Sequence, residues 1–183
     1  MSLGLSGQGQ NTIQNSIALY IASGANLDVA GSYQIFGTLS GSGNINLSLD
    51  SGITINQRTF SNYSGVIGGQ GWITKSGAGV LKLSNVSTYT QQTVLAGGEI
   101  IIGVSNALPT TSALSFSGAS RLLMLEEGIS QGFGSLTSSI GLTSSIFGYE
   151  KNTFNLNQSS STTFNGGLFG GFSFVKSGIG TLT

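Results

Sequence analysis

Hydrophobic and small polar residues alternate along most of the chain. In residues 44–49, 52–56 and 115–117, every second side chain is Ile, Leu or Phe, and the positions between them hold Ser, Thr, Asn or Gly. A period of two predicts strands with one buried side and one exposed side. Gly, Asn, Asp and Ser end each stretch, as tight turns require. The pattern therefore predicts many short strands joined by turns, with almost no helix.

One phrase occurs almost twice. Residues 65–81 return as residues 166–182, so that Lys75 corresponds to Lys176, 101 positions later. The positions that are identical in the two copies are Gly65, Gly69, Lys75, Ser76, Gly77, Gly79 and Leu81. A weaker copy, with an aromatic residue followed by glycines and apolar residues, spans residues 36–45. Internal repetition predicts one structural unit stacked on copies of itself, with the duplicated lysines at matching sites along the stack.

The spacing of the strands narrows the choice of fold. Strand and turn recur about every 20–30 residues, too close for strand–helix–strand units, which need about 30 or more. An immunoglobulin-like sandwich also has short strands, but it does not repeat a phrase internally. The sequence therefore predicts an all-β, right-handed parallel β-helix, also called a β-solenoid. About eight coils stacked about 4.8 Å apart would form a rod roughly 40 Å long.

We expect residues 1–183 to form a single β-solenoid segment. Repeat-like units lie around residues 35–59, 60–104 and 105–163, and a truncated unit covers residues 164–183. Because the last unit stops within the repeated phrase, we expect the chain to be a fragment of a longer repeat rod.

Composition agrees with an ordered rod and removes several classes of partner. Glycine accounts for 30 of the 183 residues and proline for only 1, which favours strands and tight turns over disorder. Charged residues make up 7% of the chain, and the net charge is +0. This balance does not attract nucleic acid or an anionic membrane. No run approaches the 18 apolar residues of a transmembrane helix.

Cysteine and histidine are both absent. Disulfides and thiolate chemistry are therefore excluded, and so are the commonest acid–base catalyst and the commonest metal ligand. We expect no cofactor, no metal ion and no catalytic site.

Two adjoining segments resemble a known family. Residues 73–84 read Ile-Thr-Lys-Ser-Gly-Ala-Gly-Val-Leu-Lys-Leu-Ser, and residues 87–100 read Ser-Thr-Tyr-Thr-Gln-Gln-Thr-Val-Leu-Ala-Gly-Gly-Glu-Ile. They resemble the passenger-associated transport repeats of bacterial autotransporters, also described as autotransporter-associated β-strand repeats. Residues 105–109 look like the segment between two such repeats. The chain departs from the family at Gln91 and Gln92, where the family usually has two glycines.

The resemblance implies a β-helical passenger domain that is secreted across the bacterial outer membrane. Such passengers are displayed at the cell surface or released outside the cell, and they are commonly adhesins, surface fibres or stalks. The repeat region of the family carries no catalytic residues that could be transferred to this chain. The likeness is best over residues 60–140 and resumes at residues 164–183.

The charged residues offer little catalytic chemistry. The carboxylates are Asp28, Asp50, Glu99, Glu126, Glu127 and Glu150. Glu126 and Glu127 are adjacent, so in a strand they point to opposite sides. Asp28, Asp50 and Glu126 occupy the same place in a recurring strand-and-turn phrase, which favours a role in turns. Lys75-Ser76 and Lys176-Ser177 resemble serine–lysine dyads, but adjacent strand residues diverge; we expect the lysines to discourage wrong strand pairing at edges.

Aromatic residues give the remaining candidates for a binding site. Most recur at equivalent places in the repeats, which favours a ladder inside the rod; the set is Phe36, Phe60, Tyr63, Trp72, Tyr89, Phe164, Phe172 and Phe174. Trp72 and Tyr89 have no aromatic counterpart in the other copy. They are therefore the sequence's candidates for an exposed contact with a ligand such as a sugar.

These observations favour a non-enzymatic, extracellular structural or adhesive segment, such as a stalk or a surface fibre. Its expected partners are copies of itself, joined end to end or laterally, and a glycan or protein receptor on a host or other surface. The alternative is a carbohydrate-binding or carbohydrate-cleaving β-helix, similar to a lyase or a phage tailspike, which rests on analogy of architecture alone.

Overall fold

The chain forms a parallel β-solenoid. The computed structural model describes residues 2–6, 17–139 and 144–183, and these ranges contain strands but no helix. Every strand pairing in them is parallel, and each strand pairs with strands one coil earlier or later. The predicted fold class is confirmed.

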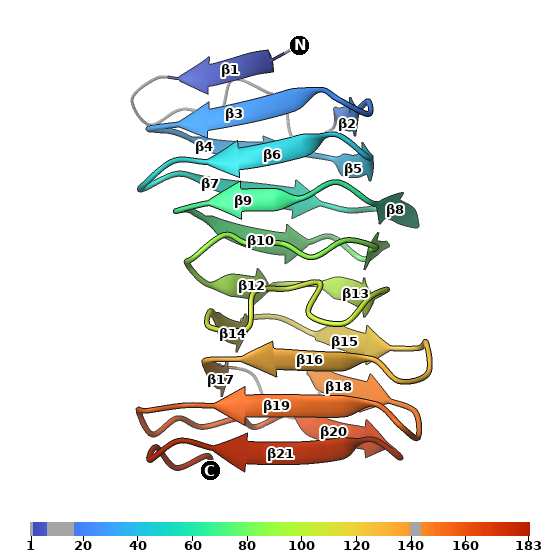
Figure 1. Cartoon of the computed structure of the whole chain (residues 1–183), viewed down its shortest axis with the longest axis vertical. Helices are drawn as coiled ribbons and strands as arrows, with labels where there is room; N and C mark the ends of the chain where they lie inside the picture. The colour runs from blue at the N-terminus through green and yellow to red at the C-terminus, as the bar shows by residue number, and fades with distance from the viewer. Residues whose placement is uncertain (1, 7–16, 140–143) are drawn as a thin grey trace.

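Three faces run along the solenoid (Figure 1). Face I is the longest, and its strands are β2 (Ala18–Ile21), β5 (Thr38–Gly41), β8 (Ser61–Tyr63), β11 (Val80–Leu83), β13 (Gly98–Ile102), β15 (Ser120–Met124), β18 (Ser145–Gly148) and β20 (Gly167–Gly170). Face II consists of β4 (Tyr33–Phe36), β7 (Gly52–Asn56), β10 (Trp72–Ser76), β12 (Thr93–Leu95), β14 (Ala113–Phe116) and β17 (Ser135–Ser138).

Face III has two sheets. The first contains β1 (Ser2–Ser6), β3 (Asn26–Ala30), β6 (Asn44–Leu47) and β9 (Ile67–Gly69), and the second contains β16 (Ser130–Phe133), β19 (Thr153–Asn157) and β21 (Ser173–Ser177). Between them, residues 84–92 and 103–111 form loops instead of strands. Backbone hydrogen bonds still link these layers, from Thr88 N to Ile67 O at 2.8 Å, from Ser87 N to Ala107 O at 3.1 Å, and from Asn106 N to Ser130 O at 2.8 Å.

The chain passes from face I to face III to face II in each coil. In Figure 1 the front strands run to the left and those behind run to the right as the chain descends, which makes the coil right-handed. The eight strands of face I mark eight coils in the described part of the chain. Coil length varies, because Asn26 pairs with Asn44, 18 residues on, whereas Leu122 pairs with Ile146, 24 residues on. The predicted units 60–104 and 105–163 therefore each span about two coils or more.

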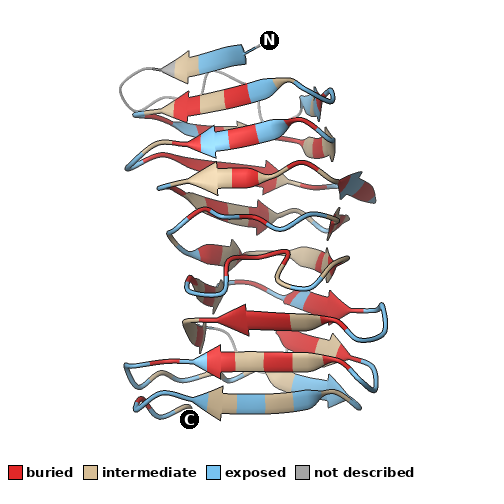
Figure 2. Cartoon of the chain, viewed as in Figure 1, coloured by how far each residue is buried: buried red, intermediate tan, exposed pale blue. Residues whose placement is uncertain are grey.

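The core is a set of ladders that run along the axis (Figure 2). On face II, Ile53 pairs with Ile73, and both side chains are fully buried. Aromatic rings also stack inside, since the centroids of Phe133 and Phe154 lie 5.3 Å apart and those of Phe154 and Phe174 lie 5.7 Å apart. An internal aromatic ladder is therefore present.

Not every aromatic residue that we assigned to this ladder lies inside. Phe36 and Tyr63 are fully buried, and the Tyr63 hydroxyl donates a hydrogen bond to Gly43 O at 2.6 Å. Phe60 is 63% exposed, so its assignment to the interior is wrong. Phe60 lies in the corner between β7 and β8, where the chain no longer alternates between inside and outside.

The duplicated phrase occupies two different places in the cross-section. In the first copy β9 lies on face III and β10 on face II, whereas in the second copy β20 lies on face I and β21 on face III. The expectation that the duplicated lysines would match along the axis is therefore wrong, because the second copy is turned by one face. The weak copy at residues 36–45, on β5 and β6, uses the same two faces as the second copy.

A shared corner explains why the phrase fits in both places. Gly41, Gly69 and Gly170 each end their strand with φ between 100° and 105°, a conformation that favours glycine. A Cβ atom on Gly69 would lie 2.1 Å from the carbonyl oxygen of Leu47, and one on Gly170 would lie 2.0 Å from that of Gly148. The phrase therefore specifies a tight corner against the preceding coil, whichever face the corner joins.

Candidate functional site

The two candidate aromatic residues have different surroundings. Trp72 lies on the outer side of β10, whereas Tyr89 lies in the loop of residues 84–92 and is only 1% exposed. The hydroxyls of Tyr89 and Thr93 are hydrogen-bonded to each other, and burial raises the pKa of Tyr89. The expectation that Tyr89 is an exposed ligand contact is wrong. Tyr89 instead anchors its loop from inside the core.

Trp72 belongs to an exposed pair of aromatic rings. Tyr33 and Trp72 both pair with Gly52, which lies between them in the ladder of face II. The indole covers Gly52, where a Cβ atom would lie 2.3 Å from Trp72 Cε2. The rings of Tyr33 and Trp72 are nearly parallel, at 17°, with their centroids 6.4 Å apart. This partly exposed pair is the surface that Trp72 offers to a ligand.

Lys75 is not an edge residue but part of the core. Its side chain is fully buried on the same side of β10 as Ile73. The Nζ atom donates hydrogen bonds to three carbonyl oxygens, those of Ser76 at 2.8 Å, Gly77 at 3.0 Å and Gly97 at 2.9 Å. Gly97 belongs to the next coil, so the ammonium group holds two successive coils together. Burial lowers the pKa of Lys75 from 10.5 to about 8.

Lys176 repeats this arrangement at another corner. Its Nζ atom donates to the carbonyl oxygens of Ser177 at 2.6 Å and Gly178 at 3.2 Å, as Lys75 does to Ser76 and Gly77. Neither lysine is hydrogen-bonded to the side chain of the serine that follows it. The Lys-Ser pairs are therefore structural corners. The expectation that the lysines discourage wrong pairing at strand edges is wrong for Lys75, because β10 is paired on both sides, whereas Lys176 lies on β21, the last strand of its sheet.

A second buried side chain supports the same corners. Gln57 follows β7 and donates from Nε2 to the carbonyl oxygen of Thr59 at 2.8 Å and to Ser61 Oγ at 2.9 Å. Its counterpart 101 residues later, Gln158, donates from Nε2 to Thr181 O at 2.8 Å. The duplication therefore begins before residue 65. The sequence analysis missed the correspondence between Gln57 and Gln158, although an Asn-Gln dipeptide occurs at both places, as Asn56-Gln57 and as Asn157-Gln158.

Three of the six carboxylates are paired with cations. Ion pairs join the coils between Lys82 and Glu126 at 2.9 Å, between Lys151 and Glu127 at 2.7 Å, and between Arg121 and Glu99. In residues 2–6, 17–139 and 144–183, no group of three or more acidic side chains is placed to hold a metal ion.

The prediction that three carboxylates occupy the same place in a recurring turn is only partly correct. Asp50 has φ of 57° and Glu126 follows β15 in a turn, as expected. Asp28 lies within β3, where Asn46 Nδ2 donates to its Oδ1 at 3.4 Å, and Ser2 also donates to it. In the ladder Asp28 pairs with Gly4 and Asn46, and its hydrogen-bond partners Ser2 and Asn46 lie on adjacent coils.

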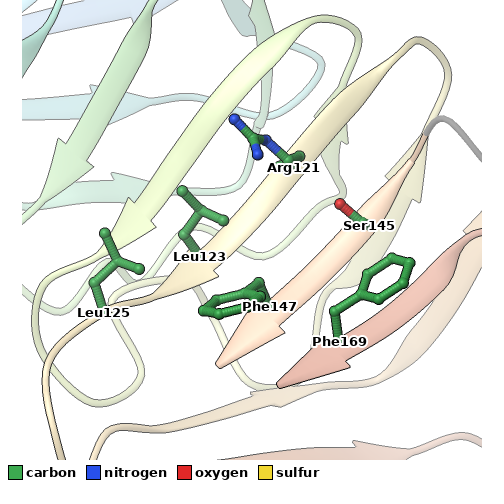
Figure 3. Close-up of a pocket in the computed structure, with 6 residues that line it drawn as sticks. All are labelled: Arg121, Leu123, Leu125, Ser145, Phe147 and Phe169. Carbon is green, nitrogen blue, oxygen red and sulfur yellow. The ribbon is translucent and has the colours of Figure 1, made fainter. Parts of the chain in front are cut away.

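Face I carries an outward hollow that the sequence analysis did not identify (Figure 3). Its volume is about 510 Å³, and it is lined by Arg121, Leu123, Leu125, Ser145, Phe147 and Phe169. The sequence does contain a signal for this hollow, because the alternation of apolar and polar residues fails on three neighbouring strands of face I. Apolar residues stand side by side at Leu122-Leu123, Ile146-Phe147 and Leu168-Phe169, so both sides of these strands are apolar.

Comparisons with protein families, with curated proteins and with solved structures found no match for this chain. In the described ranges there is also no helix with the length and apolar character needed to cross a membrane. The likeness to autotransporter passenger repeats therefore stays a prediction from the sequence.

Proposed function

We propose that this chain is a non-enzymatic structural or adhesive segment of a bacterial surface protein, secreted across the outer membrane as a stalk or fibre. The observation that carries the proposal is the continuous pairing of eight coils along face I. Stacked coils satisfy one another's backbone hydrogen bonds and form an elongated rod. Such a rod spaces or projects whatever is attached to it.

The hydrogen bonds of the inward polar groups support a structural role. Lys75, Gln57 and Asn152 each link backbone atoms of neighbouring residues or coils. Among the described residues, every fully buried side-chain nitrogen and oxygen has a hydrogen-bond partner. A core with satisfied polar groups keeps a single stacking register, because slippage would leave those groups unpaired.

Two measurements test the proposal. Antibodies against this chain are expected to label intact cells that express the full reading frame; labelling only after permeabilisation would overturn the surface location. Small-angle X-ray scattering of the purified chain is expected to give a rod roughly 40 Å long. A scattering profile typical of a spherical particle would overturn the proposal that the chain is a stalk.

Glycan binding is a second candidate that the Tyr33–Trp72 pair favours. Nearly parallel, partly exposed rings can cover the apolar face of a sugar. A glycan array probed with the chain and with Trp72→Ala tests this candidate. Binding that is lost in Trp72→Ala supports it, and no binding to any glycan counts against it.

A further inference from the structure

One asparagine of the chain precedes a glycine. Asn165 is followed by Gly166, whereas every other asparagine in the sequence is followed by a residue that has a side chain. A following glycine leaves its backbone nitrogen open to the asparagine side chain, because no Cβ atom crowds the approach. Asparagine before glycine is the order in which the amide is most readily lost without an enzyme, so the surroundings of Asn165 decide whether the loss can occur in the folded chain.

The fold leaves this pair of residues accessible. Asn165 is exposed in the corner that leads into β20, and its Nδ2 donates to the carbonyl oxygen of Ser138 over a long distance of 3.4 Å. Among the described residues, the backbone N–H of Gly166 has no hydrogen-bond partner, whereas that of Gly167 donates to Ser144 O at 2.9 Å. The nitrogen that would attack the side chain is therefore not held by a hydrogen bond.

Asn85 provides a comparison within the same molecule. It is also exposed, and its Nδ2 also donates to a carbonyl oxygen of the preceding coil, that of Ser64 at 3.0 Å. The residue that follows is Val86, whose branched side chain crowds the backbone nitrogen. This nitrogen also donates a hydrogen bond to Asn85 Oδ1 at 2.9 Å. Asn85 therefore shares the exposure of Asn165 but lacks the open nitrogen.

The corner itself requires the glycine. A Cβ atom on Gly166 would lie 2.6 Å from a carbonyl oxygen of the preceding coil, and one on the corresponding Gly65 would lie 1.7 Å from such an oxygen. The residue before the glycine differs between the two copies, because Ser64 stands where the second copy has Asn165. Serine has no amide to lose, so only the second copy of this corner carries the reactive pair.

We propose that Asn165 is a site of spontaneous deamidation in the folded chain. The backbone nitrogen of Gly166 gives up its proton and forms a bond to Cγ of Asn165, and Nδ2 leaves as ammonia, which closes a succinimide ring. Water then opens the ring at one of its two carbonyl carbons and leaves either aspartate or isoaspartate. Water is the only other reactant, and the inference is independent of the structural role proposed above.

Isoaspartate would lengthen the main chain at a corner that is fixed on both sides. Its main chain runs through Cβ and Cγ, which adds one backbone atom. On one side Phe164 N donates to Thr183 O at 2.8 Å, and on the other Gly167 N donates to Ser144 O at 2.9 Å. The longer path between these two bonds is expected to displace one of them and to loosen β20. The product also adds a negative charge to a chain whose net charge is +0.

Ageing of the purified, folded chain in mildly alkaline buffer tests the proposal, because the attacking nitrogen must lose its proton. Peptide mapping by mass spectrometry is expected to find aspartate and isoaspartate at position 165, while Asn85 keeps its amide. Asn165→Ser, which copies the corner at Ser64, is the matched control and is expected to gain no acidic group there. Survival of the Asn165 amide for as long as that of Asn85, or conversion only after a denaturant is added, would overturn the proposal.

Thermal unfolding before and after ageing tests the effect on the corner. The aged chain is expected to unfold at a lower temperature than the fresh chain, and Asn165→Ser is expected to stay unchanged. Asn165→Asp carries the new charge without the longer main chain, so it measures the effect of the charge alone. A loss in the aged chain no larger than that in Asn165→Asp would overturn the displacement at β20. None of these outcomes depends on whether the chain is a stalk, so the two proposals fail independently.

Discussion

Lys75 and Lys176 make the same hydrogen bonds to the two residues that follow them, although they lie on different faces of the solenoid. Their burial differs, because the coil that contains Gly97 covers Lys75 and adds a third carbonyl acceptor. The two lysines therefore form a matched pair for measuring what this corner contributes to stability.

Replacing Lys75 by Ala is expected to lower the free energy of unfolding by about 2–4 kcal/mol, because it leaves buried carbonyls unpaired and opens a cavity. Lys176→Ala is expected to cost less than about 1 kcal/mol, since solvent can replace its hydrogen bonds. Chemical denaturation followed by circular dichroism measures both. Equal losses in the two variants would show that the third carbonyl and the burial of Lys75 do not matter.

The low pKa of Lys75 predicts how stability depends on pH. The folded chain releases this proton at about pH 8, whereas the unfolded chain holds it to about 10.5. Between these values the unfolded state binds more protons, so stability is expected to rise with pH from about 8. The favourable contribution is complete above 10.5 and is lost as the pH falls through about 8.

Tyr63 and Tyr89 have the opposite effect on the pH dependence of stability, at higher pH. Burial raises the pKa of both hydroxyls above the ordinary 10.0, so they ionise first in the unfolded state and stability falls above about pH 10. Unfolding measured from pH 7 to pH 9.5 isolates the lysine. Lys75→Met is the control and is expected to show no rise; a rise of the same size in this variant would contradict the assignment.

Gly69→Ala is expected to be much more harmful than Gly24→Ala. Both glycines have positive φ, but a Cβ atom on Gly24 meets no atom within 4 Å, whereas one on Gly69 meets the Leu47 carbonyl oxygen. Gly24→Ala is expected to cost about 1 kcal/mol from backbone conformation alone. Gly69→Ala is expected to cost roughly 3 kcal/mol or more, because two coils must separate. Thermal and chemical unfolding of both variants provide the comparison, and similar costs would refute the close approach.

Gln57→Leu is expected to destabilise the chain by roughly 1–3 kcal/mol, because the carbonyl of Thr59 and the amide of Leu39 lose their buried partner. Gln70→Leu, at an exposed position, is the matched control and is expected to change stability by less than about 0.5 kcal/mol. A loss in Gln57→Leu no larger than in the control would mean that water replaces the glutamine.

The alternation of residues was sufficient to predict the strands and most of the core, and the repeated phrase together with the spacing of the strands predicted the parallel solenoid. The same alternation placed Lys75 inward, because Ile73 and Lys75 share one side of a strand, but the charge of lysine argued for the surface. Burial becomes acceptable only because three carbonyl oxygens converge on its Nζ atom. That convergence depends on the position of the next coil, which no local pattern encodes.

Other features depend on coil length or on loops. The faces occupied by the duplicated phrase follow from coils of 18 to 24 residues, and the shift of 101 residues is not a whole number of them. Tyr89 lies in a segment without alternation, so its direction could not be predicted from periodicity. The outward hollow on face I was predictable from the loss of alternation at Ile146-Phe147 and Leu168-Phe169.

The same phrase forms the corner between faces III and II in one copy and between faces I and III in the other, so different corners of the solenoid accept the same sequence. A duplication could therefore lengthen such a chain by one face instead of one full coil. Every residue after the insertion would then be rotated about the long axis of the solenoid. Such an insertion would change the direction in which the rod presents an attached domain.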